Sequence, residues 1–160
     1  WVDARKVYRM WYAAGDDFEP DVICYAESSD GISWDKYTDG PVLSCGSSKS
    51  YDSAKVGGCD VVVVDESLLV MFYIGYQNVD VARVCVAVSN DDGLSWVRSK
   101  ANPILSPRKG KWDSDAVYKP SAIIDATGVV RLWFNARRNH DEYIGMAYVF
   151  DIESLLEVGA

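Results

Sequence analysis

The sequence repeats itself, and this limits the possible folds more than any other feature. The stretch YDSAKVGGCDVVVVD begins at Tyr51 and the related stretch WDSDAVYKPSAIIDA begins at Trp112, an offset of 112 − 51 = 61 residues. LVMFY (69–73) and VRLWF (130–134) align at the same offset, and YRMWY (8–12) lies one offset earlier. A repeat of this length predicts successive copies of one supersecondary unit, each packed on its neighbours.

Each unit has the composition of β-strands. Runs such as KVYRMWYAA, LLVMFYIGY and RVCVAVS are rich in aromatic and β-branched residues, which favour strands. Asp-Gly occurs in SSDGISW (28–34) and again in SNDDGLSW (89–96). Between apolar runs it is typical of a tight hairpin, here between the third and fourth strands of a unit. Only DIESLLEV (151–158) has a helical pattern.

Four antiparallel strands in every unit, repeated every ~40–60 residues, are typical of a β-propeller blade. We therefore predict an all-β chain of propeller type, with blade segments at roughly 1–50, 51–111 and 112–160. The 160 residues hold about two and a half four-stranded blades, whereas propellers close with at least about four. The chain opens within the pattern and without an initiator Met. We expect part of a longer polypeptide, or self-association that completes the ring.

Charge and cysteine content exclude several classes of partner. The net charge of −8 and the pI of about 4.6 argue against a nucleic-acid partner, because the phosphate backbone would be repelled. No run is long and apolar enough to span a bilayer. The four cysteines lack Cys-x-x-Cys spacing and His140 is the only histidine, so we expect neither a metal site nor a cofactor. The lack of a disulfide pattern or a glycosylation sequon weakly favours an intracellular setting.

These motifs resemble the five-bladed β-propeller glycosidase superfamily of arabinanase, levansucrase and invertase. The resemblance covers nearly the whole chain and is carried by YRMWYAAG, CYAESSDGISWDKYTDGPVLS, YDSAKVGGCDVVVVDESLLVMFYIG, AVSNDDGLSWVRSKANPILSP and WDSDAVYKPSAIIDATGVVRLWFNARRNHDEYIGMAY. It implies a five-bladed propeller and a carbohydrate-active protein. That protein would be a glycoside hydrolase that acts on or binds a furanoside or related sugar.

Two other functions fit the sequence. One is a non-catalytic propeller that binds a glycan or a protein, since a fold does not imply an activity. The other is a sialidase-like propeller, because SNDDGLSW (89–96) fits the Asp-box pattern Ser-x-Asp-x-Gly-x-x-Trp. A sialidase site needs three arginines and a Tyr–Glu pair, which no spacing in this sequence nominates.

Asp60 and Asp115 are the catalytic candidates. Glycoside cleavage usually needs two carboxyl groups, and the inner strands of a propeller converge on its axis. Both residues stand where the units differ, since Ser121 is equivalent to Asp60 and Ala54 to Asp115. The resemblance implies that Asp60 tunes the pKa of the general acid and orients the substrate. The alternative for Asp60 is a polar residue at a strand end, held by loop amides.

The resemblance also places a general-acid glutamate two positions before Pro120. Tyr118 stands there instead and cannot replace a carboxylic acid poised near neutral pH. Asp115 lies a few residues upstream and is the nearest substitute, although it aligns poorly with the family acid.

Lys119, Tyr118, Arg137, Arg138 and His140 are the candidates for substrate binding, because the cationic group among them belongs to the third unit alone. Cations at this place would bind a carboxylated or phosphorylated sugar, or hydrogen-bond hydroxyl groups. The alternative is a set of loop charges paired with the acidic residues at 141–142.

Residues that recur are expected to be structural. Asp52 and Asp113 recur in YDS and WDS, and we predict turn aspartates that accept backbone N–H bonds. Trp11, Phe72 and Trp133 recur in the aromatic strands, where we expect packing between blades.

Overall fold

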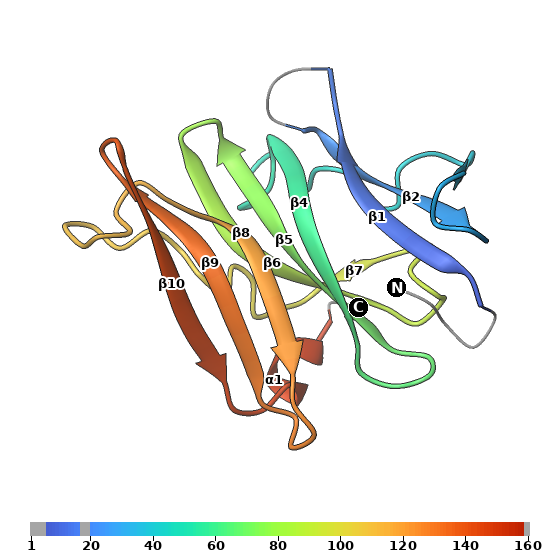
Figure 1. Ribbon diagram of the computed structural model, residues 1–160. Helices are drawn as coiled ribbons and strands as arrows, with labels where there is room; N and C mark the ends of the chain where they lie inside the picture. Colours follow the sequence, from blue (N-terminus) through green and yellow to red (C-terminus); the bar gives the residue numbers. More distant parts are fainter. Residues whose placement is uncertain (1–5, 17–19, 159–160) are drawn as a thin grey trace.

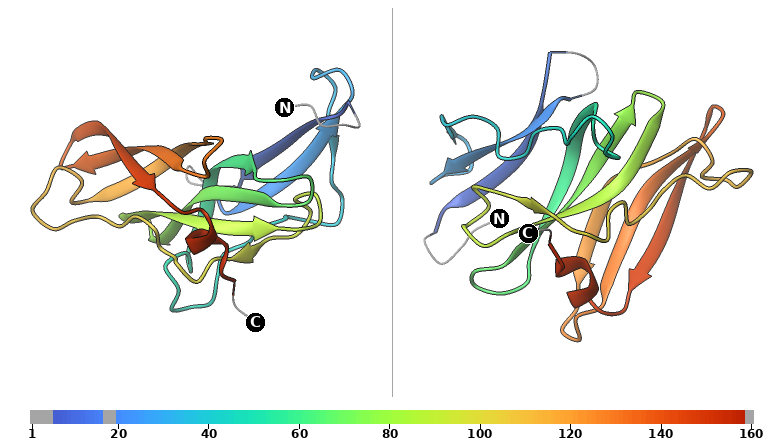
Figure 2. Two further views of the ribbon diagram at one scale, coloured as in Figure 1. Left: turned by 90° about the horizontal axis from the view of Figure 1, so that it is seen from below. Right: turned by 180° about the vertical axis from the view of Figure 1, so that it is seen from behind.

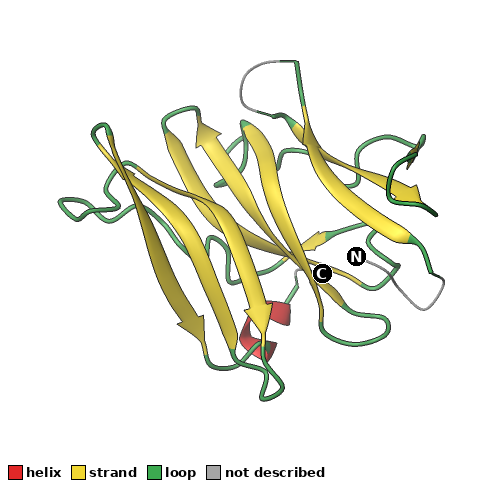
Figure 3. Ribbon diagram, viewed as in Figure 1, coloured by secondary structure: helices red, strands yellow, loops and turns green. Residues whose placement is uncertain are grey.

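The computed structural model describes residues 6–16 and 20–158, which form ten β-strands and one short helix. The strands make three antiparallel sheets that stand side by side in chain order (Figures 1, 2 and 3). The first sheet holds β1 (Tyr8–Ala14), β2 (Val22–Ser28) and β3 (Asp35–Lys36). The middle sheet holds β4 (Lys55–Val63), β5 (Leu69–Asn78), β6 (Val81–Ser89) and β7 (Val97–Arg98). The third holds β8 (Ala116–Ile124), β9 (Val130–Arg138) and β10 (Asp141–Val149).

The three sheets are successive blades of a partial β-propeller, as the repeat predicts. The middle sheet is a whole four-stranded blade in the order β4-β5-β6-β7. The repeat aligns β1 with β5, so the first sheet corresponds to the second, third and fourth strands of a blade. The third sheet corresponds to the first three. The inner strands β4 and β8 run next to each other (Figure 1).

After β10 the chain leaves the blade pattern. It forms the helix α1 (Glu153–Leu156) within the segment that the sequence marked as helical. The amide of Lys100 then donates to the carbonyl of Glu157 at 2.7 Å, and Val158 bridges Ser99. The end of the described chain is thereby attached to the middle sheet rather than to the third.

Alternate residues of the middle sheet pack on opposite neighbours, because successive side chains of a strand point to opposite faces. Phe72 of β5 belongs to the apolar cluster shared with the third sheet. Met71 and Tyr73 belong to the cluster shared with the first sheet. The core of the molecule therefore consists of two layers between blades. Within the described residues, the helix is far too short to cross a bilayer.

The outward face of the third sheet is exposed in a way that the repeat explains. Val84 and Val86 of β6 are fully buried, because the third sheet covers them. By strand register the corresponding residues of β10 are Ile144 and Met146, which are 77% and 46% exposed. In a propeller such a face is covered by the next blade, so the open face agrees with a partial ring.

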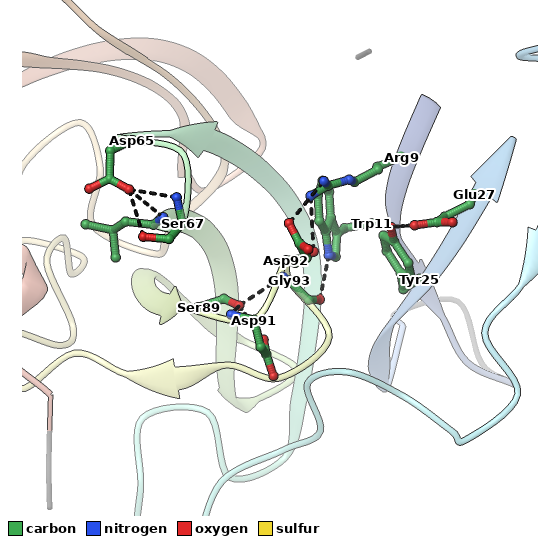
Figure 4. Close-up of polar contacts among 11 residues, drawn as sticks. Arg9, Trp11, Tyr25, Glu27, Asp65, Ser67, Ser89, Asp91, Asp92 and Gly93 are labelled. Carbon is green, nitrogen blue, oxygen red and sulfur yellow. Dashed lines mark hydrogen bonds and ion pairs between the residues drawn. The ribbon is translucent and has the colours of Figure 1, made fainter. Parts of the chain in front are cut away.

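The two Asp-Gly loops fold into the same hydrogen-bonded turn between the third and fourth strands. In the first, the Ser28 hydroxyl accepts from the amide of Gly31, while Asp30 accepts from the amides two and three residues on, all at 2.8 Å. In the second, Ser89 accepts from the amide of Gly93 at 2.9 Å (Figure 4). Asp91 accepts from the amide of residue 95, also at 2.9 Å. In both loops, side chains of the repeated motif thus accept hydrogen bonds from backbone amides of the same loop.

The second loop also fastens the first sheet to the middle sheet (Figure 4). Arg9 Nη2 pairs with Asp92 Oδ1 at 3.1 Å, and the Trp11 indole donates to the carbonyl of Gly93 at 2.9 Å. The indole of Trp96 donates to the same carbonyl at 2.9 Å. The Trp96 and Trp11 rings pack edge to face, with their centroids 6.1 Å apart. These contacts give the loop a structural role.

The recurring aspartates are buried turn residues, but their strongest partners are side chains rather than the predicted amides. Asp52 is fully buried and accepts from Tyr73 Oη at 2.9 Å and from Arg98 Nε at 2.7 Å. Asp113 is 3% exposed and accepts from Arg108 Nε at 2.7 Å. Each carboxylate therefore anchors the turn before an inner strand through an ion pair.

Candidate functional site

A cleft of about 490 Å³ opens between the middle and third sheets, at the end where β4 and β8 begin. The β5–β6 turn borders the same end of the sheets (Figure 1). Apolar groups of Ile74 and Ala82 form one wall, and Tyr118, Lys119, Arg137 and Glu142 form the other. An apolar wall opposite a few convergent polar groups is the usual construction of a small-molecule site.

Both inner strands are irregular where they border this cleft. The register of β4 shifts between Gly57 and Cys59, and that of β8 shifts after Tyr118. Gly58 and Lys119 are equivalent in the repeat, and both have a positive φ, at +24° and +48°. A positive φ is strained for a lysine, because of its Cβ atom, but not for a glycine. The β8 bulge therefore turns the chain at the cost of local strain, a feature common beside functional sites.

Tyr118 and Glu142 meet inside the cleft. The Tyr118 hydroxyl donates to Glu142 Oε2, and Lys119 Nζ lies 5.7 Å from the centre of the Tyr118 ring. Glu142 stands opposite Arg137 in the β9–β10 register. A Tyr–Glu contact is one element of a sialidase-like site, but among the described residues Arg137 is the single arginine that lines this cleft.

Glu142 is the member of this group that sequence reasoning did not select. It was expected only as a partner for the loop cations, because it follows them along the chain. Its place depends on the β9–β10 pairing, which sets it across from Arg137 and within reach of Tyr118. The one available signal was its place in the acidic pair at 141–142, directly after the cationic residues within 137–140.

Asp115 borders a second cleft, of about 720 Å³, with His140. Arg137 and Glu142 line both clefts, so the two spaces adjoin. Asp115 accepts from the Ser114 hydroxyl at 2.7 Å and from the amide of Asn139 at 2.6 Å. These two hydrogen bonds, with a smaller contribution from nearby arginines, hold the pKa of Asp115 below its usual value. Asp115 is thus a carboxylate near neutral pH and is unsuited to be a general acid.

Asp60 lies elsewhere. It lines a third cleft, of about 380 Å³, with Arg9, Met10 and Trp11 of β1. Its Oδ2 accepts from the amide of Ala122 on β8 at 2.8 Å and so joins the two inner strands. The two catalytic candidates therefore line separate clefts.

The remaining candidates lie around the β9–β10 turn. Arg138 and His140 are exposed, and His140 lines the second cleft. Tyr118, Lys119 and Arg137 are the members that the fold brings together in one cleft. Within residues 6–16 and 20–158, no group of three His, Cys, Asp or Glu side chains is arranged to hold a metal ion.

Comparison with known proteins identifies the fold. The chain superposes on a family 117 glycoside hydrolase from Zobellia galactanivorans with a TM-score of 0.78 and 19% identity, over 98% of this chain and 52% of the other. Fructan 1-exohydrolase IIa from Cichorium intybus gives 0.69 and 20%, over 91% and 28%. An endo-arabinase from Bacteroides thetaiotaomicron gives 0.65 and 17%, over 100% and 51%. The resemblance to the propeller glycosidases is confirmed at the level of the fold.

Sequence comparison adds little about activity. Two uncharacterised proteins from strains of Mycobacterium tuberculosis are 28% identical to the chain over 119 residues. The match covers 71% of this chain and 37% of each relative, so the chain spans well under half of their length. No family model matches the sequence.

Proposed function

We propose that the chain carries the sugar site of a glycoside hydrolase-like propeller, and that the cleft between the middle and third sheets binds a furanoside or related sugar. The observation that carries the proposal is the convergence of Tyr118, Lys119, Arg137 and Glu142 at the start of an inner strand. An aromatic ring, an acceptor and two cations suit a ligand that offers hydroxyl groups and an apolar ring face. The fold is that of carbohydrate-active propellers.

Hydrolysis would require two carboxyl groups across the glycosidic bond. Glu142 offers one beside Tyr118, which is the place where the family resemblance puts the general acid. Asp115, ionised and next to Arg137, would stabilise positive charge at the sugar or activate water. Asp60 would act from the neighbouring inner strand by orienting the substrate.

The test is a screen of the complete protein against arabinosides, fructosides and mannosides, followed by Glu142→Gln and Asp60→Asn. Removing a carboxyl group that acts as acid or base typically lowers kcat by about 10²–10⁴-fold. Glu66→Gln is the matched control, because Glu66 is exposed near the β4–β5 turn. Full turnover by the Glu142 and Asp60 variants would remove both residues from the mechanism.

A second candidate function is a non-catalytic propeller that binds a glycan or a protein. It is favoured because both catalytic candidates predicted from the sequence make hydrogen bonds that support the fold. Asp60 accepts from the amide of Ala122, and Asp115 accepts from the amide of Asn139. A glycan array that detects binding by the protein, together with no hydrolysis of the bound glycans, would select this function.

A further inference from the structure

Arg137 is one of three described arginines, with Arg83 and Arg138, that make no ion pair, and it is the one of the three that lines the cleft between the middle and third sheets. Four arginines each pair with an aspartate: Arg9 with Asp92, Arg98 with Asp52, Arg108 with Asp113, and Arg131 with Asp125, at 2.7–3.1 Å. Arg137 makes no ion pair or hydrogen bond through its guanidinium to any described residue, although acidic groups stand on the neighbouring strand and turn. Asp115 acts on Arg137 through space alone, so this half-buried guanidinium lacks the direct hydrogen-bonded contact that the four paired arginines have.

Lys119 is a second cation without an anionic partner among the described residues. Its ammonium group lies over the Tyr118 ring, and its positive φ keeps it at the bulge of β8. Together with Arg137 and Glu142, it gives the charged lining of this cleft an excess of one positive charge. This excess stands out in a chain with a net charge of −8, because the mean field of such a protein repels anions.

Glu142 does not cancel the two cations, because one of its oxygens already accepts from Tyr118. Its other oxygen can accept from a sugar hydroxyl. The cleft thus offers an acceptor for hydroxyl groups next to a guanidinium and an ammonium group. A planar guanidinium binds a carboxylate or a phosphate through two parallel hydrogen bonds, and an ammonium group adds a point charge.

From this arrangement we infer that the cleft recognises an anionic sugar, with Arg137 and Lys119 binding a carboxylate or phosphate group. The inference rests on the proposed function, since it names the substrate class of the same cleft. A neutral sugar lacks the group that would pair the two cations, so it binds more weakly.

The experiment is isothermal titration of the complete protein at low salt with four probes. These are galacturonic acid oligosaccharides, the matching neutral galactose oligosaccharides, glucose 6-phosphate and inorganic phosphate. We expect one of the anionic probes to bind at least about tenfold more tightly than the neutral sugar, because hydrogen bonds to charged groups are the stronger ones. The preference should shrink as salt screens the charges.

Arg137→Gln should abolish the preference, and Lys109→Gln is the matched control for the loss of one positive charge, because Lys109 is exposed and lines none of the three clefts. Melting temperatures identify any variant that fails to fold, and Lys119→Met then serves as the second probe of the site. Tighter binding of galacturonate identifies a carboxylate ligand, and tighter binding of either phosphate compound identifies a phosphate.

The outcomes separate the two proposals. Equal binding of neutral and anionic sugars, unaffected by Arg137→Gln, would overturn the anionic ligand and leave the sugar site standing. Failure of every sugar and of phosphate to bind would overturn both.

Discussion

Asp52 and Asp113 offer a matched pair of substitutions, because the repeat places them at equivalent positions with different surroundings. The Asp52 carboxylate is fully buried and accepts from Tyr73 Oη and Arg98 Nε, and the Arg98 side chain is 29% exposed. Asp52→Asn keeps the shape but removes the charge, which leaves Arg98 without its counter-ion. Breaking a buried pair costs about 3–5 kcal/mol. The partial exposure of Arg98 places the expected loss of unfolding free energy near the lower end, at about 3 kcal/mol.

The equivalent change Asp113→Asn should cost less. Its partner Arg108 is 60% exposed, so water replaces the lost interaction. Phe134 stands where the middle blade has Tyr73, so no hydroxyl is left unpaired, and one Asp113 oxygen is already buried without a partner. We expect a loss of about 1 kcal/mol.

Urea unfolding monitored by tryptophan fluorescence measures both losses, and Tyr73→Phe gives the share of the hydroxyl, about 1 kcal/mol. The expected order of stability is wild type, Asp113→Asn, then Asp52→Asn. An Asp113→Asn variant as unstable as Asp52→Asn would refute the reasoning from partner exposure.

Two further predictions concern the loops. Gly93→Ala should destabilise the protein by about 1–3 kcal/mol more than Gly110→Ala in urea unfolding. Both glycines have φ near +80°, so the backbone strain of an alanine is similar at the two positions. A Cβ at Gly93 would lie 2.4 Å from the Trp11 ring, whereas a Cβ at Gly110 would have no atom within 4 Å. Equal losses of unfolding free energy in the two variants would contradict this packing. The melting temperature should decrease as the pH is lowered below about 4. The reason is that Asp65 and Asp125 each accept hydrogen bonds within their own turn, which hold the pKa values of both carboxyl groups below 3.8. Their contribution is complete above the unfolded pKa and is lost as the pH falls through the folded values, so replacing both by Asn should flatten the acid side of the profile.

The order and type of the strands could be predicted from the sequence, because side-chain alternation and Asp-Gly turns are local signals. The blade count followed from the offset of 61 residues. The side-chain partners could not be predicted in the same way. Asp52 was expected to hold amides, yet it binds Arg98 of β7, which reaches it only once the blade is closed.

The composition of the site shows the same limit. The place of Glu142 depends on the pairing of β10 with β9 and on the bulge of β8, and neither has a signal in a single sequence. Comparing the units did direct attention to Lys119, because the cationic group that includes it belongs to the third unit alone, and the family resemblance directed attention to Tyr118. The separation of Asp60 from Asp115 could not be predicted, because the sequence placed both at the start of an inner strand. In the structure β4 begins already at Lys55, so Asp60 lies within the strand, whereas Asp115 directly precedes β8.

Hydrogen exchange of the complete protein, with and without its bound sugar, tests most directly whether ligands occupy the cleft between the middle and third sheets. The expected result is slower exchange at the start of β8 and in the β9–β10 turn, with no change in the loops 28–34 and 89–96. Protection confined to those two Asp-Gly loops would contradict the assignment, because it would place the ligand at the repeated, structural end of the blades.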